Sequence, residues 1–210
     1  MRRPDFIARQ SRCPTGLLGR VIGAIMSFET AAANDEALKV LGLEPGDRVL
    51  EVGFGHGRTI ERAAALVPDG FVAGIDTSEE MLHMATRRCR PLVEAGQVQL
   101  TRGDSVSIPY ADGFFDKALG IHVLYFWAAP TTHLYELRRV LRAEGRLVLG
   151  FRPTHDAAAA DFPASIYSFY ETEKVPFRGS RRLASRPRSL SVDSLALLQG
   201  SYGRHSTPRT

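Results

Sequence analysis

Cysteine and long apolar runs are scarce in this chain of 210 residues. The two cysteines, Cys13 and Cys89, lie far apart and form no metal-binding or redox spacing, so we expect a reducing cytoplasm and no metal site. The three-cysteine cluster of a radical-generating iron–sulfur centre is absent, which excludes that chemistry. The longest apolar run, 17–28, is interrupted by Arg20 and is too short to span a bilayer.

Most of the chain has no net positive charge. From Lys174 onward there are eight Lys or Arg and one acid, a net charge of +7, whereas the preceding 173 residues carry nineteen Lys or Arg and twenty-two acids, a net charge of −3. The tail is rich in serine and arginine, so we predict residues 176–210 to be disordered or divergent. No aromatic residues alternate with its arginines, which favours a solvated tail over a nucleic-acid-binding arm.

Between about residues 47 and 151, short β-type runs alternate with helical patterns. The predicted helices cover residues 59–67, with Ile60, Ala63, Ala64 and Val67 on one face, residues 78–90 with Ser78 as the N-cap, and a helix lined by Leu134, Leu137, Val140 and Leu141 that stops at Glu144-Gly145. The predicted strands are 48–52, 71–75, 98–101, 115–123 and 146–151. This alternation predicts an α/β fold with a doubly wound, mainly parallel sheet, which binds ligands beyond the carboxyl ends of its strands.

The segments on either side of this core are less regular. Residues 1–45 are predicted to form a helical lead-in or cap, with helices at 17–28 and 31–41 that could pack on the sheet or cover its ligand edge. Residues 46–175 are predicted to form the main domain. A further helix is predicted at 161–173. Beyond it, residues 195–198 form a single short apolar patch, so the C-terminal strands of the sheet are doubtful and the sheet could end at five strands with an exposed edge.

The most informative stretch is Val49-Leu50-Glu51-Val52-Gly53-Phe54-Gly55-His56-Gly57. An apolar strand ends in Glu51, and glycines at alternate positions lead into a helix. Glycines allow a tight turn and the close approach of a ligand, and the amino end of the helix favours a negatively charged ligand group. Asp76 ends the next strand, 21 positions after Gly55, where its carboxylate can accept hydrogen bonds from a ribose diol.

Dinucleotide-binding and S-adenosylmethionine-binding folds share this layout. A dinucleotide fingerprint, G-x-G-x-x-G, would place glycine where Arg58 stands. The alternate glycines instead resemble motif I of the class I S-adenosylmethionine-dependent methyltransferases. Three later stretches resemble motifs of the same family: 74–82; 103–105 followed by 108–110 and 114–116; and 136–147, in which Ala143-Glu144 replaces the usual Pro-Gly. The resemblance covers roughly residues 45–151.

The resemblance implies an enzyme that uses S-adenosylmethionine as donor and releases S-adenosylhomocysteine. It implies that His122 faces the methyl group or the acceptor. The donor-binding residues it implies are Glu51, Gly53, Phe54, Gly55 and Gly57 around the methionine part, Asp76 and Thr77 at the ribose, and Asp104 and Ser105 at the adenine. Each assignment has a structural alternative: a plain tight turn for the glycines, a helix N-cap for Asp76, a turn residue for Asp104, and a hydrogen-bonded structural residue for His122.

Residues after the fourth strand bear on the acceptor. Gly120-Ile121-His122-Val123 is not the Asn/Asp-Pro-Pro-Tyr sequence of amino-directed methyltransferases, and no Pro-Cys nucleophile occurs. We therefore expect a small-molecule acceptor, apolar or aromatic if residues 125–127 face it rather than the core. Two alternatives remain: a non-catalytic donor-binding or interaction protein with a degenerate C-terminus, and an NAD(P)-dependent oxidoreductase that would use Tyr170 and Lys174. The oligomeric state stays open.

Overall fold

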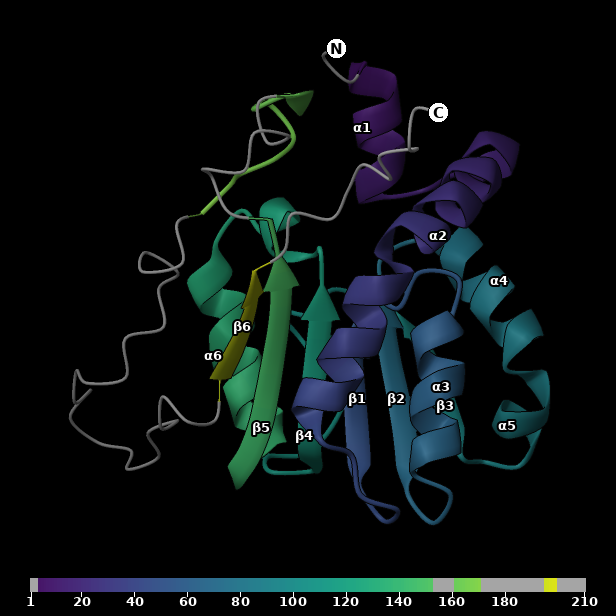
Figure 1. Cartoon of the computed structure of the whole chain (residues 1–210), viewed down its shortest axis with the longest axis vertical. Helices are drawn as coiled ribbons and strands as arrows, with labels where there is room; N and C mark the ends of the chain where they lie inside the picture. The colour runs from purple at the N-terminus through teal and green to yellow at the C-terminus, as the bar shows by residue number, and fades with distance from the viewer. Residues whose placement is uncertain (1–3, 153–160, 171–194, 200–210) are drawn as a thin grey trace, which may run out of the picture.

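The computed structural model describes residues 4–152, 161–170 and 195–199 (Figure 1). Its centre is a six-stranded parallel sheet in the order β3-β2-β1-β4-β5-β6. The strands are β1 (Arg48–Val52), β2 (Phe71–Asp76), β3 (Val98–Arg102), β4 (Phe115–Ile121), β5 (Leu141–Phe151) and β6 (Leu195–Gln199). The predicted doubly wound α/β fold is thereby confirmed.

Helices cover both faces of the sheet. They are α1 (Asp5–Arg12), α2 (Gly16–Leu41), α3 (Arg58–Leu66), α4 (Glu79–Arg88), α5 (Arg90–Glu94), the short 3₁₀ helix η1 (Leu124–Phe126) and α6 (Pro130–Val140). In Figure 1, α2 and α3 lie in front of the strands and α6 lies behind them.

The core consists of two clusters, one on each face of the sheet. In β1, Leu50 and Val52 belong to one cluster and Val49 to the other, as expected when successive side chains of a strand point to opposite faces. The predicted apolar face of α3 is confirmed, because Ile60, Ala63, Ala64 and Val67 are at most 1% exposed. Ser78 caps α4 as predicted, since its Oγ accepts a hydrogen bond from the amide of Met81 at 3.2 Å.

The N-terminal helices differ from the prediction. The two helices expected at 17–28 and 31–41 are one element, α2, whose parts Gly16–Met26 and Thr30–Leu41 meet at a 60° bend. The additional helix α1 precedes it. Within the described ranges no single helix is long and apolar enough to cross a membrane, and the two parts of α2 meet the length and composition criteria only when taken together.

The predicted boundary between the last helix and strand was wrong. α6 ends at Val140, and Leu141 pairs with Phe115 of β4 as the first residue of β5. A register shift between Phe115 and Lys117 accommodates the longer strand. Leu141 has helical spacing, but pairing with the neighbouring strand determines its conformation. Local sequence does not predict this pairing.

The helix predicted at 161–173 is not present in its described part, 161–170, and residues 171–173 lie outside the described ranges. Pro163 disfavours a helical conformation at Phe162. The segment forms a turn in which the amides of Ile166 and Tyr167 donate to the Pro163 carbonyl. The amide of Ser168 donates to the carbonyl of Tyr125, so the segment is joined to η1.

A sixth strand lies within the range expected to be a tail. β6 pairs in parallel with β5, with Leu195 opposite Leu147 and Gln199 opposite Phe151. Buried strands of parallel sheets have continuous apolar runs rather than apolar–polar alternation, and the short apolar run Leu195 to Leu198 is of this kind. The rest of the predicted tail, 176–194 and 200–210, lies outside the described residues.

Candidate functional site

A cavity of about 610 Å³ lies where β1, β2 and β4 end. Nine of the ten predicted site residues line it: Glu51, Gly53, Phe54, Gly55, Asp76, Thr77, Asp104, Ser105 and His122. The site is at the carboxyl edge of the sheet, on either side of β1, where the chain changes direction in a doubly wound fold. Its volume is typical of a pocket for a small molecule.

Two glycines of the turn after β1 adopt left-handed backbone for different reasons. Gly53 has φ +72°, and a Cβ there would come within 2.3 Å of Val123 Cγ1, so this glycine permits the approach of the segment after β4. Gly55 has φ +54°, and a Cβ there would meet no atom within 4 Å although the residue lines the cavity. The space beside Gly55 is therefore open to a ligand.

Gly57 is the predicted residue that does not line the cavity. It has φ +84° and is the N-cap of α3. A Cβ there would lie 2.8 Å from the Cβ of Ala85, so the glycine lets the start of α3 pack against α4. Its position is explained by packing between the two helices.

Glu51, the second-last residue of β1, is a buried acid, 4% exposed, and its Oε2 atom has no hydrogen-bond partner. Burial raises the pKa of this carboxyl to about 8; the nearby Asp76 raises it further, and a hydrogen bond from Thr59 lowers it. A buried, unpaired carboxyl oxygen is costly unless a donor reaches it, and Glu51 is one of the residues that line the cavity. The residue therefore fits a ligand that carries a cationic N–H group.

Asp76 is the last residue of β2, the strand next to β1. Its Oδ2 accepts a hydrogen bond from the amide of Gly55 at 2.9 Å, and its Oδ1 accepts one from the amide of Ser78 at 2.8 Å. Burial raises the pKa of this carboxyl, and the amide hydrogen bonds oppose the change. Each carboxylate oxygen has further acceptor capacity, so the side chain can both hold the glycine turn and accept hydroxyl donors.

The loop after β3 brings Asp104 and Ser105 to the cavity. Oδ1 of Asp104 accepts a hydrogen bond from the amide of Val106 at 3.1 Å, which is the turn contact considered in the sequence analysis. Ser105 Oγ lies 2.8 Å from Nδ1 of His133, and that imidazole stacks on Trp127 with ring centroids 4.5 Å apart. His133 and Trp127 are also cavity-lining residues.

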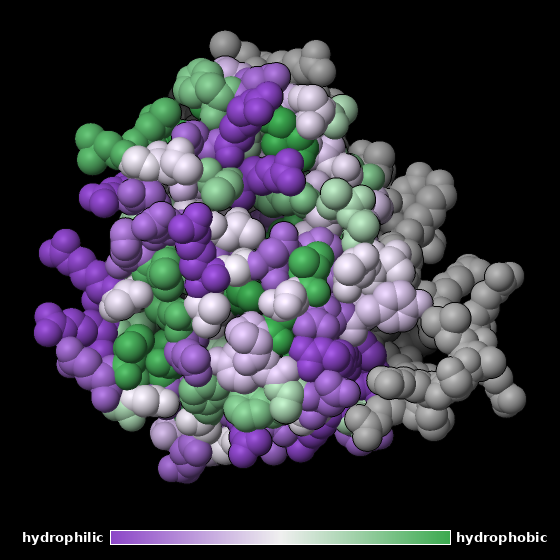
Figure 2. All heavy atoms as spheres, turned by 180° about the vertical axis from the view of Figure 1, so that it is seen from behind, coloured by the Kyte–Doolittle hydropathy of each residue, from purple (hydrophilic) through white to green (hydrophobic). Residues whose placement is uncertain are grey.

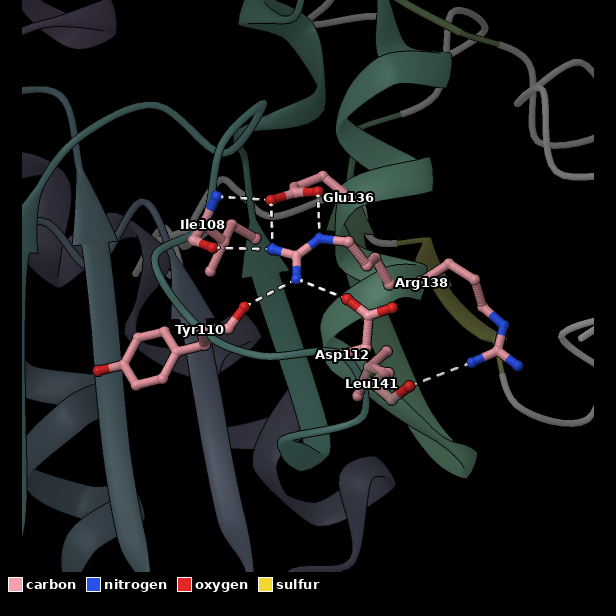
Figure 3. A network of polar contacts seen from close by, with 7 residues as sticks. Ile108, Tyr110, Asp112, Glu136, Arg138 and Leu141 are labelled. Atoms are coloured by element: carbon pink, nitrogen blue, oxygen red, sulfur yellow. Dashed lines mark hydrogen bonds and ion pairs between the residues drawn. The ribbon is translucent and has the colours of Figure 1, made fainter.

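Side chains of α6 clamp the same loop through a network of hydrogen bonds and ion pairs (Figure 3). Glu136 Oε1 accepts a hydrogen bond from the amide of Ile108 at 2.7 Å. Arg139 donates to both Glu136 oxygens, to the carbonyls of Ile108 and Tyr110, and to Asp112, at 2.7–2.9 Å. These contacts with the guanidinium hold the pKa of the Glu136 carboxyl below its usual range. Glu136 and Arg139 belong to the stretch 136–147 that resembles a methyltransferase motif. Together they hold the loop that leads away from the site.

His122 follows the last residue of β4 with φ +60°, unusual for a residue other than glycine. Its amide donates to the carbonyl of Gly150 at 2.7 Å, and its Nδ1 lies 2.9 Å from Tyr125 Oη. Burial, and secondarily Arg152, lower the pKa of the imidazole to about 4, so the ring is uncharged near neutral pH. The structure therefore places a neutral, hydrogen-bonded histidine at the cavity wall.

The N-terminal helices close one side of the cavity. Ser11, Arg12, Cys13 and Pro14 line it from the end of α1 and the connection to α2, and Gly23, Met26, Thr30 and Asn34 line it from α2. Ser78, which caps α4, donates to the carbonyl of Pro14 at 2.5 Å. Parts of the N-terminal segment thus belong to the cavity wall.

Some lining residues were not identified from the sequence. His133 carried no signal, because it is a single histidine in the first turn of a helix whose pattern is set by leucines. The choice between core and cavity for 125–127 has a mixed answer: Tyr125 and Trp127 are 5% and 6% exposed within a core cluster, yet Trp127 and Phe126 also line the cavity. Among the described residues no group of three or more His, Cys, Asp or Glu could hold a metal ion.

Comparisons with known proteins show which family this chain resembles. The methyltransferase domain family matches residues 50–149. The uncharacterized methyltransferase YdaC of Bacillus subtilis is 30% identical over 141 residues, 67% of this chain and 76% of that protein. The demethylmenaquinone methyltransferase of Tropheryma whipplei is 37% identical over 198 residues, 87% of this chain and 77% of that protein. A crystal structure of a SAM dependent methyltransferase from Aquifex aeolicus matches with a TM-score of 0.50 and 28% identity, over 54% of this chain and 61% of that chain.

This chain is shorter than many of its curated relatives. The chain spans about half the length of most of the curated relatives that it matches. The family itself follows from the domain match, from relatives of which the chain covers three quarters or more, and from the shared fold. The chain therefore belongs to the methyltransferase family, the class I enzymes for which S-adenosylmethionine is the methyl donor and S-adenosylhomocysteine the product.

Proposed function

We propose that this protein transfers a methyl group from S-adenosylmethionine to a small apolar molecule by in-line displacement. The observation that carries the proposal is the pair of acids Glu51 and Asp76, which flank a glycine turn in one cavity. The donor supplies a methyl group already activated by its sulfonium. The protein therefore has to position the two reactants, which can contribute roughly 7–11 kcal/mol to lowering the barrier.

The donor fits the residues present. Glu51, with its unpaired Oε2, would accept a hydrogen bond from the ammonium of the methionine part, beside the open space at Gly55. Asp76 would accept the ribose hydroxyls with the acceptor capacity left after its two amide contacts. Asp104 and Ser105 would border the adenine, with Phe54 and Thr77 completing the wall.

The acceptor class is inferred from the apolar part of the lining. Met26, Val123, Phe126 and Trp127 contribute apolar side chains to the lining of the cavity, which His122 also lines. Relatives named for small molecules include the demethylmenaquinone methyltransferase and the 27-O-demethylrifamycin SV methyltransferase of Amycolatopsis mediterranei. We propose an acceptor of this kind rather than a nucleic acid, and, from the free cysteines Cys13 and Cys89, a cytoplasmic site of action.

A screen for product tests this assignment. The purified chain is incubated with S-adenosylmethionine and one of several acceptors: a short-chain demethylmenaquinone, a set of phenols and catechols, a tRNA pool and an unstructured peptide. We expect S-adenosylhomocysteine to form with a quinone or phenol only. Formation with tRNA or peptide alone would contradict the small-molecule assignment. A protein that binds the donor but turns over no acceptor would favour the non-catalytic alternative.

We propose that His122 takes the proton of a hydroxyl or amine acceptor. Its uncharged ring is in the state that can accept a proton, although a pKa of about 4 makes it a weak base. We expect His122→Asn, which tolerates the left-handed backbone, to lower kcat about 100-fold and to leave the affinity for S-adenosylhomocysteine unchanged. Steady-state kinetics with a hydroxyl acceptor measure this effect, with Tyr125→Phe as the control for the Nδ1 contact. A wild-type kcat in His122→Asn would end the assignment.

A further inference from the structure

Large apolar side chains are exposed in an unusual concentration near the N-terminus. Five of the eight exposed large apolar residues of the described part of the chain lie between residues 6 and 25: Phe6, Leu17, Leu18, Val21 and Ile25, which we call the N-terminal apolar face. Leu17 is 77% exposed, and the other four are 49–57% exposed. Figure 2, seen from behind, shows hydrophobic residues protruding at the upper left, where this part of α2 lies after the rotation from Figure 1.

Helix geometry explains why these side chains face outward together. Leu17, Val21 and Ile25 are spaced by four residues and share one side of α2. The other side carries Gly19 and Gly23, where an added Cβ would overlap Pro14 and Met81 respectively. This half of α2 thus packs its small residues against the protein and turns its large apolar residues to solvent.

Positive charge accompanies the face. Residues 1–28 contain five arginines and one acid, Asp5. Arg9 and Arg12 belong to α1 and are exposed, and Arg20 lies between Leu18 and Val21 with its side chain 51% exposed. Arg20 forms an ion pair with Glu80 at 2.6 Å. Exposed apolar residues among arginines are typical of helices that lie in the plane of a membrane interface.

We propose that the N-terminal apolar face docks on the surface of a bilayer that contains anionic lipid. The arginines favour a bilayer over a second copy of the chain as the binding partner of this face. A two-fold interface through the face would bring the arginines of both copies together, whereas an anionic leaflet attracts all of them. The apolar side chains would enter the boundary between headgroups and acyl chains, and the arginines would contact lipid phosphates.

Docking would bring the cavity close to the lipid. Arg12 and Met26 belong to the same helices and line the cavity, so its N-terminal wall would lie next to the bilayer. An acceptor dissolved in the membrane could then reach the site without crossing water. This consequence for the acceptor rests on the proposed function, whereas the docking rests on the exposed face and its charge.

Vesicle flotation tests the docking. The full chain is mixed with vesicles of phosphatidylcholine alone or with about 30% phosphatidylglycerol. We expect binding only to the anionic vesicles, weakened by NaCl at about 0.5 M, and at least about tenfold weaker in Val21→Asp/Ile25→Asp. The matched control is Leu66→Asp on α3, a leucine 49% exposed outside the face, which should bind like wild type.

Two further measurements make the outcomes distinct. Calorimetric titration with S-adenosylhomocysteine should give the same affinity for Val21→Asp/Ile25→Asp as for wild type, because neither residue lines the cavity. Vesicle binding without donor binding would overturn the proposed function and leave the docking intact. Absence of vesicle binding, or equal loss in Leu66→Asp, would overturn the docking. A dimer in sedimentation that dissociates in Val21→Asp/Ile25→Asp, without vesicle binding, would assign the face to a second copy.

Discussion

Glu51 is the residue in which burial and ligand chemistry are most directly linked. Its carboxyl has a pKa of about 8 in the folded chain and 4.5 ordinarily, chiefly because burial penalises the ionised form. Between these values the folded chain holds a proton that the unfolded chain has released. The contribution of Glu51 to the free energy of unfolding therefore falls as pH rises through this window.

The first prediction concerns this fall. Between about pH 6 and pH 8, wild type should lose stability relative to Glu51→Gln. In wild type the folded state keeps a proton on Glu51 that the unfolded state has released, and this becomes more costly as pH rises, whereas glutamine does not titrate. Urea unfolding at the two pH values measures the difference. Glu94→Gln, which removes an exposed acid on α5, should follow wild type. Parallel pH profiles for Glu51→Gln and wild type would show that Glu51 is not buried as described.

Donor binding should release the proton that the buried Glu51 carboxyl holds. An ammonium group beside Glu51 would favour its ionised form, so binding at about pH 7 should release a proton, and affinity should rise up to about tenfold per pH unit below the pKa. Calorimetry of S-adenosylhomocysteine binding in buffers with different ionisation enthalpies counts the protons. Release should disappear in Glu51→Gln. Unchanged release in that variant would place the ammonium elsewhere.

The second prediction separates the two glycines of the turn. Gly53→Ala should lower the free energy of unfolding by about 2–4 kcal/mol, through left-handed strain and overlap with Val123. Gly55→Ala should lower it by only about 1–2 kcal/mol from strain, yet weaken donor binding, because its Cβ would stand in the cavity. Gly46→Ala, with open space and no positive φ, is the control. Equal donor affinity in Gly55→Ala and wild type would contradict the placement of the donor.

Site residues were predictable where a backbone turn or the end of a strand requires a particular residue type at a particular spacing. The acid, the alternate glycines and a second acid after the next strand follow from the turn and the sheet edge, so Glu51, Gly53, Gly55 and Asp76 could be named from the sequence. His133 could not, because its contacts with Ser105 and Trp127 join elements 28 and 6 residues away through tertiary packing.

At the scale of elements, the loop after β3 depends on α6. Arg139 makes five hydrogen bonds to this loop and to Glu136, with its side chain 33% exposed. The loop leads from Asp104 and Ser105 at the cavity to the start of β4. A loss of the clamp should therefore affect both stability and the site.

The third prediction is that Arg139→Ala lowers the free energy of unfolding by about 2–3 kcal/mol, because charge-assisted bonds are lost and two backbone carbonyls lose their donor. Arg139→Lys should restore only part, since an ammonium cannot reproduce the planar fork. Arg90→Ala, which removes an exposed pair with Glu94, should cost less than about 0.5 kcal/mol. Urea unfolding compares the three, and similar losses in Arg139→Ala and Arg90→Ala would contradict the clamp.

Element boundaries were predictable where side-chain periodicity and caps decide them, as for β1, α3 and the start of α4. They were not predictable where a distant partner decides. Leu141 has helical spacing but pairs with β4, and Leu195 to Leu198 become a strand only beside β5. The segment 161–170 was predicted to be helical, but it forms a turn whose Tyr167 and Phe169 rings contact the ring of Tyr125.

At the scale of the whole molecule, a parallel sheet places the loops after β1, β2 and β4 at one edge, and α1 and α2 cover that edge. The parallel α/β fold and the family were predictable, because both depend on patterns repeated over a hundred residues. The 60° bend of α2 lies close to the break expected between helices at 17–28 and 31–41, but its angle depends on packing that local sequence does not specify.

The most direct test of this account is a calorimetric titration of the full chain with S-adenosylhomocysteine, with NAD as a second ligand. We predict binding in the micromolar range typical of such sites, at least about tenfold weaker in Asp76→Ala and unchanged in the exposed control Asp69→Ala, with no heat from NAD. Thermal unfolding of each variant confirms that it is folded. Folded protein that binds NAD, or that binds S-adenosylhomocysteine equally well without the Asp76 carboxylate, would contradict the donor site.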